Sequence, residues 1–110
     1  MASVGIDIVD NQRIEKLLTE NFINKFLAEE EMEEFRTINT DDRKTEFVAG
    51  RIAAKEAVLK CLKNVNICTM RQIIIRKDEF GAPFATFNNL EIPISISHEK
   101  LYSVAVALCL

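Results

Sequence analysis

From Arg43 to Leu62 the chain reads RKTEFVAGRIAAKEAVLKCL, a run without proline in which alanine recurs at positions 49, 53, 54 and 57. Because alanine is the strongest helix former, this segment predicts one long helix. Larger apolar contacts come from Phe47, Val58, Leu59 and Leu62. The small residues would allow another backbone to pass close by. Among its polar side chains, Arg51, Lys55, Glu56 and Lys60 remain available for chemistry or for solvent.

The residues before this helix predict one strand followed by shorter helices. Apolar residues at positions 4, 6 and 8 alternate with Gly5, Asp7 and Val9, which predicts a strand with one thoroughly apolar face and Asp7 on the other. Asp10 can cap a helix from about residue 11 to residue 19. An apolar group at residues 22–27 then precedes an acidic helical segment at residues 29–35, whose charges we expect to face solvent.

The last third of the chain changes to strand patterns. The β-branched run at residues 73–75 and the segment 84–87 flank turn residues, which predicts a hairpin. Residues 92–97 and 102–110 predict two further strands. The order of strand, helices and then three or four strands predicts an α+β fold, an antiparallel sheet packed with a long helix. Since 48% of the residues are apolar, we expect residues 1–110 to form a single domain with one modest core.

Charge and cysteine content narrow the function classes. A net charge of −3 and a pI near 5.2 argue against broad nucleic-acid binding. No secretory signal is evident, and no apolar run approaches the roughly 20 residues that cross a bilayer, so we expect no membrane association and a cytoplasmic protein. Cys61, Cys68 and Cys109 fit neither a C-x-x-C pattern nor a zinc spacing with the single histidine. We therefore expect reduced, mostly buried cysteines.

Two carboxylates are candidate metal ligands. Asp7 lies within an apolar strand, where an ionised carboxylate needs a cation, a metal or several hydrogen-bond donors. A structural aspartate bonded to backbone amides, or paired with an arginine of the long helix, is the alternative. Glu56 and Lys60 emerge from one face of that helix because they are four residues apart. They could form an ordinary surface ion pair, or Glu56 could bind a hard cation while Lys60 meets phosphate oxygens.

His98, the only histidine, lies where a predicted strand ends, and loop ends often carry binding groups. A hydrogen-bonded structural role, phosphate binding and proton transfer are all open for it. Gly81 and Pro83 could be hairpin residues alone, or could allow a ligand to approach closely. Because the chain has no P-loop, Rossmann fingerprint, nucleophile elbow or metal-binding histidine pair, the residues alone indicate only a candidate Mg²⁺ and phosphate site.

Four segments, taken together, resemble a known family. They are GIDIV at residues 5–9, FVAGRIAAKEA at 47–57 with Lys60, GAP at 81–83 and ISISH at 94–98. In this order and at these separations they resemble the holo-acyl-carrier-protein synthase family of 4′-phosphopantetheinyl transferases. The resemblance runs from the first strand to the last hairpin, and it implies the 4′-phosphopantetheinyl transferase-like fold.

This resemblance implies a reaction and a role for each candidate residue of the site. The enzyme transfers a 4′-phosphopantetheine group from coenzyme A to a serine of apo acyl carrier protein. The transfer releases adenosine 3′,5′-bisphosphate and is a step of fatty acid biosynthesis. Asp7 and Glu56 are expected to bind Mg²⁺, and Lys60 to offset charge on the phosphoryl and leaving oxygens. Glu56, directly or through a water on the metal, is our hypothesis for the base that takes the serine proton.

The resemblance also implies binding residues and partners. Arg43, Arg51 and His98 match family positions near the adenosine 3′-phosphate, and the loop from Gly81 to Pro83 matches the loop beside the adenine. Ala82 departs from the family pattern, because many relatives carry lysine there. Family members form homotrimers with active sites between subunits. Their first helix meets the acidic carrier, which here indicates docking near Arg13 and Lys16.

Two other functions stay open on the residues alone. The chain could be a noncatalytic module that binds carrier protein or nucleotide, with Asp7 and Glu56 in structural roles. It could also be another Mg²⁺-dependent phosphotransfer or hydrolysis enzyme, because a set of two carboxylates and a lysine is not specific to one substrate.

Overall fold

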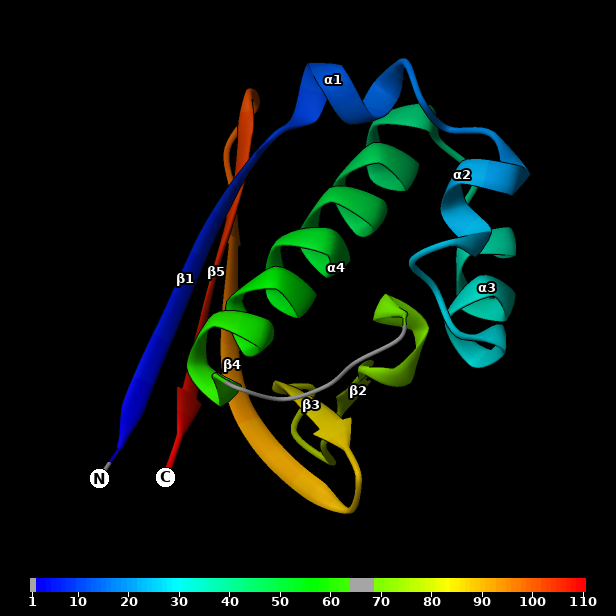
Figure 1. Ribbon diagram of the computed structural model, residues 1–110. Helices are drawn as coiled ribbons and strands as arrows, with labels where there is room; N and C mark the ends of the chain where they lie inside the picture. Colours follow the sequence, from blue (N-terminus) through cyan, green and yellow to red (C-terminus); the bar gives the residue numbers. More distant parts are fainter. Residues whose placement is uncertain (1, 64–68) are drawn as a thin grey trace.

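The computed structural model describes residues 2–63 and 69–110. Its elements in chain order are β1 (Ser3–Asp10), α1 (Asn11–Glu15), α2 (Glu20–Asn24), α3 (Glu29–Arg36), α4 (Asp41–Leu62), a 3₁₀ turn η1 (Met70–Gln72), β2 (Ile74–Lys77), β3 (Pro83–Phe87), β4 (Leu90–His98) and β5 (Tyr102–Cys109). The strands form one antiparallel sheet in the order β1-β5-β4-β3-β2, and the helices gather on one side of it (Figure 1). The predicted α+β class is confirmed.

Helix α4 is the centre of the fold, as its alanine-rich sequence predicts. Thr40 caps it by accepting a hydrogen bond from the Arg43 backbone N–H, so the helix begins at Asp41, two residues before the expected start. Its inner face is built from small side chains that lie against β1 and β5. The closest approach is at Gly5, where a Cβ would lie 1.8 Å from the Ala57 carbonyl oxygen. Only glycine therefore fits at this position of β1.

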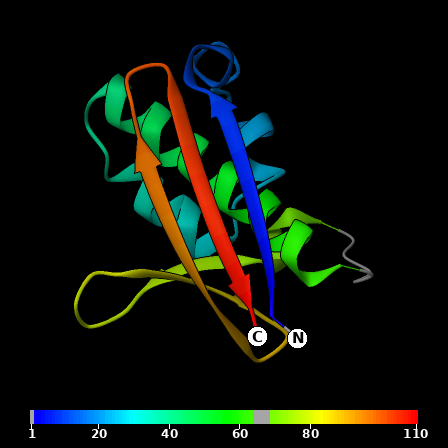
Figure 2. The same cartoon turned by 90° about the vertical axis from the view of Figure 1, so that its left-hand side faces the viewer.

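Strand β1 presents its apolar face to solvent rather than to the core. Val4, Ile6 and Ile8 are 64%, 57% and 61% exposed, whereas Gly5, Asp7 and Val9 alternate with them toward α4. On the neighbouring strand β5, Tyr102 and Val106 are also exposed. Figure 2 shows that no helix covers this side of β1, β5 and β4. We call the residues Val4, Ile6, Ile8, Tyr102 and Val106 the outer sheet face.

The N-terminal helices are shorter than expected. Asp10 caps α1 as predicted, through a hydrogen bond from the Gln12 N–H, but α1 ends at Glu15 rather than near Thr19. The reason is that the Thr19 side chain accepts a hydrogen bond from the Phe22 N–H and begins α2 instead. The predicted hairpin is confirmed, with Gly81 at a φ of +83° in the turn between β2 and β3.

The expectation of reduced cysteines is wrong for two of the three. Cys61 in the last turn of α4 and Cys109 at the end of β5 are joined by a disulfide. They are 48 residues apart in the sequence, so spacing alone did not indicate the pair. Cys68 lies outside the described residues. Within those residues, none of the helices combines the length and the apolar character that a bilayer span requires.

Candidate functional site

Asp7 and Lys60 meet where β1 passes under the last turns of α4. The Lys60 ammonium donates to the Ile6 carbonyl oxygen at 2.8 Å and to Asp7 Oδ1 at 3.2 Å. The Asp7 side chain is 20% exposed and the Lys60 side chain 53%. Asp7 is therefore paired with a lysine of the long helix, where the structural alternative expected an arginine.

Glu56 lies one helical turn before Lys60 and is half-buried. The expected alternative of a Glu56–Lys60 surface pair is not formed, since Lys60 reaches across to β1 and no ion pair among the described residues includes Glu56. Glu56 precedes Ala57, whose carbonyl oxygen is the point of closest contact with β1. This contact keeps α4 and β1 close together at the level of Asp7, Glu56 and Lys60.

The chemistry of these donors fits a magnesium ion. Mg²⁺ binds oxygen ligands, commonly one or two carboxylates together with substrate phosphates and waters. The described residues contain no cluster of three or more His, Cys, Asp or Glu that could form an all-protein cage. Asp7 and Glu56 would thus be the protein ligands of an ion whose remaining ligands come from substrate and water.

A second group of predicted residues lines a pocket of about 640 Å³ between α3, the first half of α4, the β2–β3 hairpin and the end of β4. Its lining includes Arg43, Arg51, Pro83 and His98, which are spread over more than half of the sequence. Gly81 is exposed in the hairpin turn and is not part of the lining. Glu34 and Glu46 also line the pocket, so its basic residues do not act alone.

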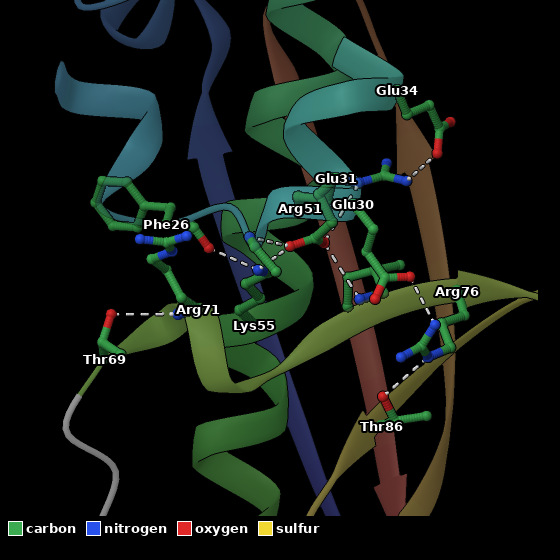
Figure 3. Close-up of polar contacts among 12 residues, drawn as sticks. Phe26, Glu30, Glu31, Glu34, Arg51, Lys55, Thr69, Arg71, Arg76 and Thr86 are labelled. Carbon is green, nitrogen blue, oxygen red and sulfur yellow. Dashed lines mark hydrogen bonds and ion pairs between the residues drawn. The ribbon is translucent and has the colours of Figure 1, made fainter. Parts of the chain in front are cut away.

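Arg51 is the most constrained of these residues (Figure 3). Its guanidinium carbon lies 3.7 Å from the centre of the Phe47 ring, and its Nη2 lies 3.5 Å from Glu34. Its Nε is buried without a hydrogen-bond partner, although Glu31 lies 3.6 Å away. Burial lowers the pKa of Arg51, against the opposing effect of Glu34 and Glu31. A buried, incompletely bonded cation of this kind favours an anionic ligand.

Beneath Arg51 lies a buried ion pair that sequence analysis missed. Lys55 Nζ donates to Glu31 Oε1 at 2.5 Å and to the Phe26 carbonyl oxygen at 2.6 Å, and both charged side chains are almost completely buried (Figure 3). Burial lowers the pKa of Lys55, with Glu31 acting in the opposite direction. Glu31 was expected to face solvent, and Lys55 to be available for chemistry or for solvent. Instead they join α3 to α4 and support Arg51.

His98 ends β4, as predicted, and its ring lies against α4 at Gly50. A Cβ on Gly50 would lie 2.8 Å from His98 Cε1. The same Cβ would lie 3.3 Å from His98 Nε2, while His98 Nδ1 lies 2.8 Å from Ser103 Oγ on β5. Both groups of site residues thus follow α4: Arg43, Arg51 and His98 along its first half, then Glu56 and Lys60.

The comparisons with known proteins identify the family of the chain. Residues 3–109 match the 4′-phosphopantetheinyl transferase superfamily. The chain is 38% identical over 111 residues to a holo-[acyl-carrier-protein] synthase of Oceanobacillus iheyensis, covering 96% of this chain and 92% of that protein. It is 43% identical over 109 residues to the corresponding protein of Mycoplasma capricolum, covering 96% and 92%.

Solved structures show the same fold. A holo-(acyl-carrier-protein) synthase from Bacillus anthracis in complex with CoA (3′,5′-ADP) has a TM-score of 0.85 and 35% identity, covering 96% of this chain and 93% of that chain. One from Helicobacter pylori in complex with coenzyme A has a TM-score of 0.78 and 29% identity, covering 94% and 96%. The chain therefore belongs to the 4′-phosphopantetheinyl transferase superfamily and, within it, to the holo-acyl-carrier-protein synthases. The predicted family and enzyme class are confirmed.

Proposed function

We propose that the pocket beside α4 binds coenzyme A and that Asp7, Glu56 and Lys60 carry out phosphopantetheine transfer. As a holo-acyl-carrier-protein synthase, the chain transfers 4′-phosphopantetheine from coenzyme A to apo acyl carrier protein, a step of fatty acid biosynthesis. The observation that supports the residue assignment best is the gathering of Arg43, Arg51, Pro83 and His98 around one pocket. Glu56 follows Arg51 by five residues, about 7.5 Å along the helix axis, a separation that an extended substrate can span.

Arg43, Arg51 and His98 bind the adenosine 3′-phosphate in this proposal, and Pro83 contacts the adenine. Arg43 is exposed at the start of α4, while Arg51 is buried with an unbonded Nε. Arg51 Nη2 and Nε already lie 3.5 Å from Glu34 and 3.6 Å from Glu31, and a phosphate would add an anionic acceptor for the remaining guanidinium N–H groups. Gly81 contributes the shape of the hairpin turn rather than a contact, since it does not line the pocket.

Asp7 and Glu56 would hold the Mg²⁺ ion in this proposal. When bound, the ion supplies positive charge that stabilises the pyrophosphate oxygens as charge develops on them. Lys60 adds a second positive charge. Its ammonium has three N–H donors, of which two are used by Ile6 and Asp7, so one is left for a phosphate oxygen.

The transfer step then needs one proton acceptor. The serine oxygen of the carrier forms a bond to the β-phosphorus, and the bond from that phosphorus to the bridging oxygen breaks. Adenosine 3′,5′-bisphosphate leaves with the electron pair of that bond. Glu56 takes the serine proton, directly or through a water, because it lies one helical turn before Lys60, is half-buried and forms no ion pair among the described residues.

The carrier docks on the basic residues of the first helix. Arg13 in α1 and Lys16 directly after it are both exposed. Since the chain as a whole is acidic, an acidic carrier would be attracted only to a local basic surface. We therefore assign carrier docking to Arg13 and Lys16.

The protein assembles as a homotrimer through the outer sheet face. A monomer would leave Val4, Ile6 and Ile8 more than half exposed beside Tyr102 and Val106, an apolar patch of the kind that marks a protein interface. A second copy of the chain is the occupant that fits, because Asp7 on the same strand would lie close to the contact and the active site would form between subunits.

We assign the enzyme to the cytoplasm, where coenzyme A and the carrier are used. The Cys61–Cys109 disulfide does not favour this compartment, because cytosolic thiols are normally kept reduced.

Mass spectrometry of an apo carrier protein, incubated with coenzyme A, Mg²⁺ and this protein, tests the proposal. We expect the carrier serine to gain one 4′-phosphopantetheine group. Binding of carrier without modification would favour the noncatalytic module, and consumption of coenzyme A without carrier modification would favour a different phosphotransfer or hydrolysis enzyme.

A further inference from the structure

A buried chain of hydrogen bonds connects the end of β4 with the start of α1. His98 Nδ1 lies 2.8 Å from Ser103 Oγ, and Ser103 Oγ lies 2.8 Å from Asn11 Oδ1. Ser103 is fully buried and Asn11 is 5% exposed. Asn11 and Ser103 are 92 residues apart, so this network forms only when β1, β4 and β5 are paired.

The surroundings of Asn11 set the direction of each hydrogen bond. Its amide nitrogen faces the carbonyl oxygens of Glu99 at 3.0 Å and Lys100 at 3.3 Å. Carbonyl oxygens only accept, so the Asn11 NH₂ donates to both and its Oδ1 must face Ser103. Ser103 has one hydroxyl proton, which it donates to Asn11. Its oxygen is then left to accept a hydrogen bond from His98, which requires a proton on His98 Nδ1.

We infer that Asn11 and Ser103 are positioning residues that hold His98 in its Nδ1–H tautomer and direct Nε2 toward the bound coenzyme A. This inference rests on the proposed function only for the identity of the ligand. With Nδ1–H donating to Ser103, Nε2 is the ring nitrogen left for a phosphate oxygen, and it can donate to that acceptor only in the imidazolium form. The Cε1 edge of the ring lies against Gly50, so α4 and β5 hold the imidazole from two sides.

Fixing the ring in this way has a chemical consequence. A ring free to change tautomer could offer either an N–H or a lone pair at the pocket. Here the neutral ring offers only the Nε2 lone pair, and it becomes a donor there only as imidazolium.

NMR of the histidine ring tests the network directly. The chain has a single histidine, so ¹⁵N-labelled protein gives one unambiguous pair of ring nitrogen signals. At a pH where the ring is neutral, we expect Nδ1 to carry the proton. Ser103→Ala removes the acceptor for that proton and should reduce the Nδ1–H population. Ser95→Ala is the matched control, because Ser95 is exposed on β4 and makes no hydrogen bond through its side chain in the described structure.

Asn11→Ala provides a second variant with a different expected result. Without Asn11 Oδ1, the Ser103 hydroxyl is free to donate to His98 Nδ1, so the Nε2–H tautomer should become dominant. Amide spectra with native dispersion in each variant would show that the fold survives. An Nε2–H tautomer in the wild-type protein would overturn the inference.

Steady-state kinetics tests the link to coenzyme A. Ser103→Ala should raise the apparent KM for coenzyme A by about 3- to 10-fold, the scale of one lost hydrogen bond, and change kcat less. An unchanged KM, together with a shifted tautomer, would contradict the positioning role. The NMR measurement uses no coenzyme A, so absence of transferase activity in the wild type would contradict the proposed function and not the tautomer.

Discussion

Lys60 on α4 lies 3.2 Å from the carboxylate of Asp7 on β1 and holds the strand and the helix together beside Glu56. The pair is partly exposed, so it contributes little to stability. The role of this ion pair is to position charged groups. It places a cation and two carboxylates at the point where Gly5 allows α4 to approach β1.

Lys60→Met should therefore lower activity without lowering stability much. We expect kcat/KM for coenzyme A to fall by about 10²- to 10³-fold, because one charge that stabilises the transition state is lost. The free energy of unfolding should change by less than about 1 kcal/mol, measured in urea. Lys44→Met on the same helix is the control and should retain activity. A Lys60→Met variant with wild-type kcat/KM would remove Lys60 from the mechanism.

Lys55→Met should have the opposite profile, with a large loss of stability. The substitution leaves Glu31 buried without its closest cation, which costs about 3 kcal/mol. The exposed pair between Glu30 and Arg76 gives a matched control, since Arg76→Met should cost less than about 1 kcal/mol (Figure 3). The double variant Glu31→Gln/Lys55→Met should recover part of the loss. Equal costs for Lys55→Met and Arg76→Met would show that burial of the pair is unimportant.

The outer sheet face should be the subunit interface. Sedimentation of the wild-type protein is expected to give the mass of three chains. Ile6→Glu places a charge on this face and should yield monomers with reduced transfer activity. Leu90→Glu, at the exposed first residue of β4, should leave the trimer intact. A monomeric wild type at working concentrations would contradict the assignment.

Carrier docking should depend on charge at α1. The variant Arg13→Glu/Lys16→Glu should raise the apparent KM for the carrier, because an acidic partner would now be repelled. The KM for coenzyme A should stay unchanged, since neither residue lines the coenzyme A pocket. Added salt should reduce the difference from wild type. An unchanged KM for the carrier would place docking elsewhere.

Local patterns predicted the fold well. The alanine-rich run from Arg43 to Leu62 and the hairpin around Gly81 indicated elements whose signals lie within a few residues of one another. The apolar alternation at Ile6 predicted a strand but not which of its faces is buried. A single sequence does not distinguish a face that meets its own core from one that is left for another chain.

The site was predictable only where residue types alone carried the signal. Glu31 looked like part of a solvated acidic run, because its partner Lys55 is 24 residues away. No local sequence pattern around Ser103 indicated its hydrogen bonds, since they depend on strands paired across the sheet. Asp7, Glu56 and Lys60 were singled out by residue type and spacing and then by the family resemblance, and their roles stay predictions.

The central claim is that Asp7 and Glu56 hold the metal on which transfer depends. The most direct measurement is the rate of mass gain by an apo carrier at increasing Mg²⁺ concentration, for wild type, Asp7→Asn and Glu56→Gln, with amide spectra to show that each variant is folded. We predict Mg²⁺-dependent addition of 4′-phosphopantetheine by the wild type and a loss of at least about 10²-fold in both variants. Wild-type rates and Mg²⁺ dependence in either folded variant would contradict the account.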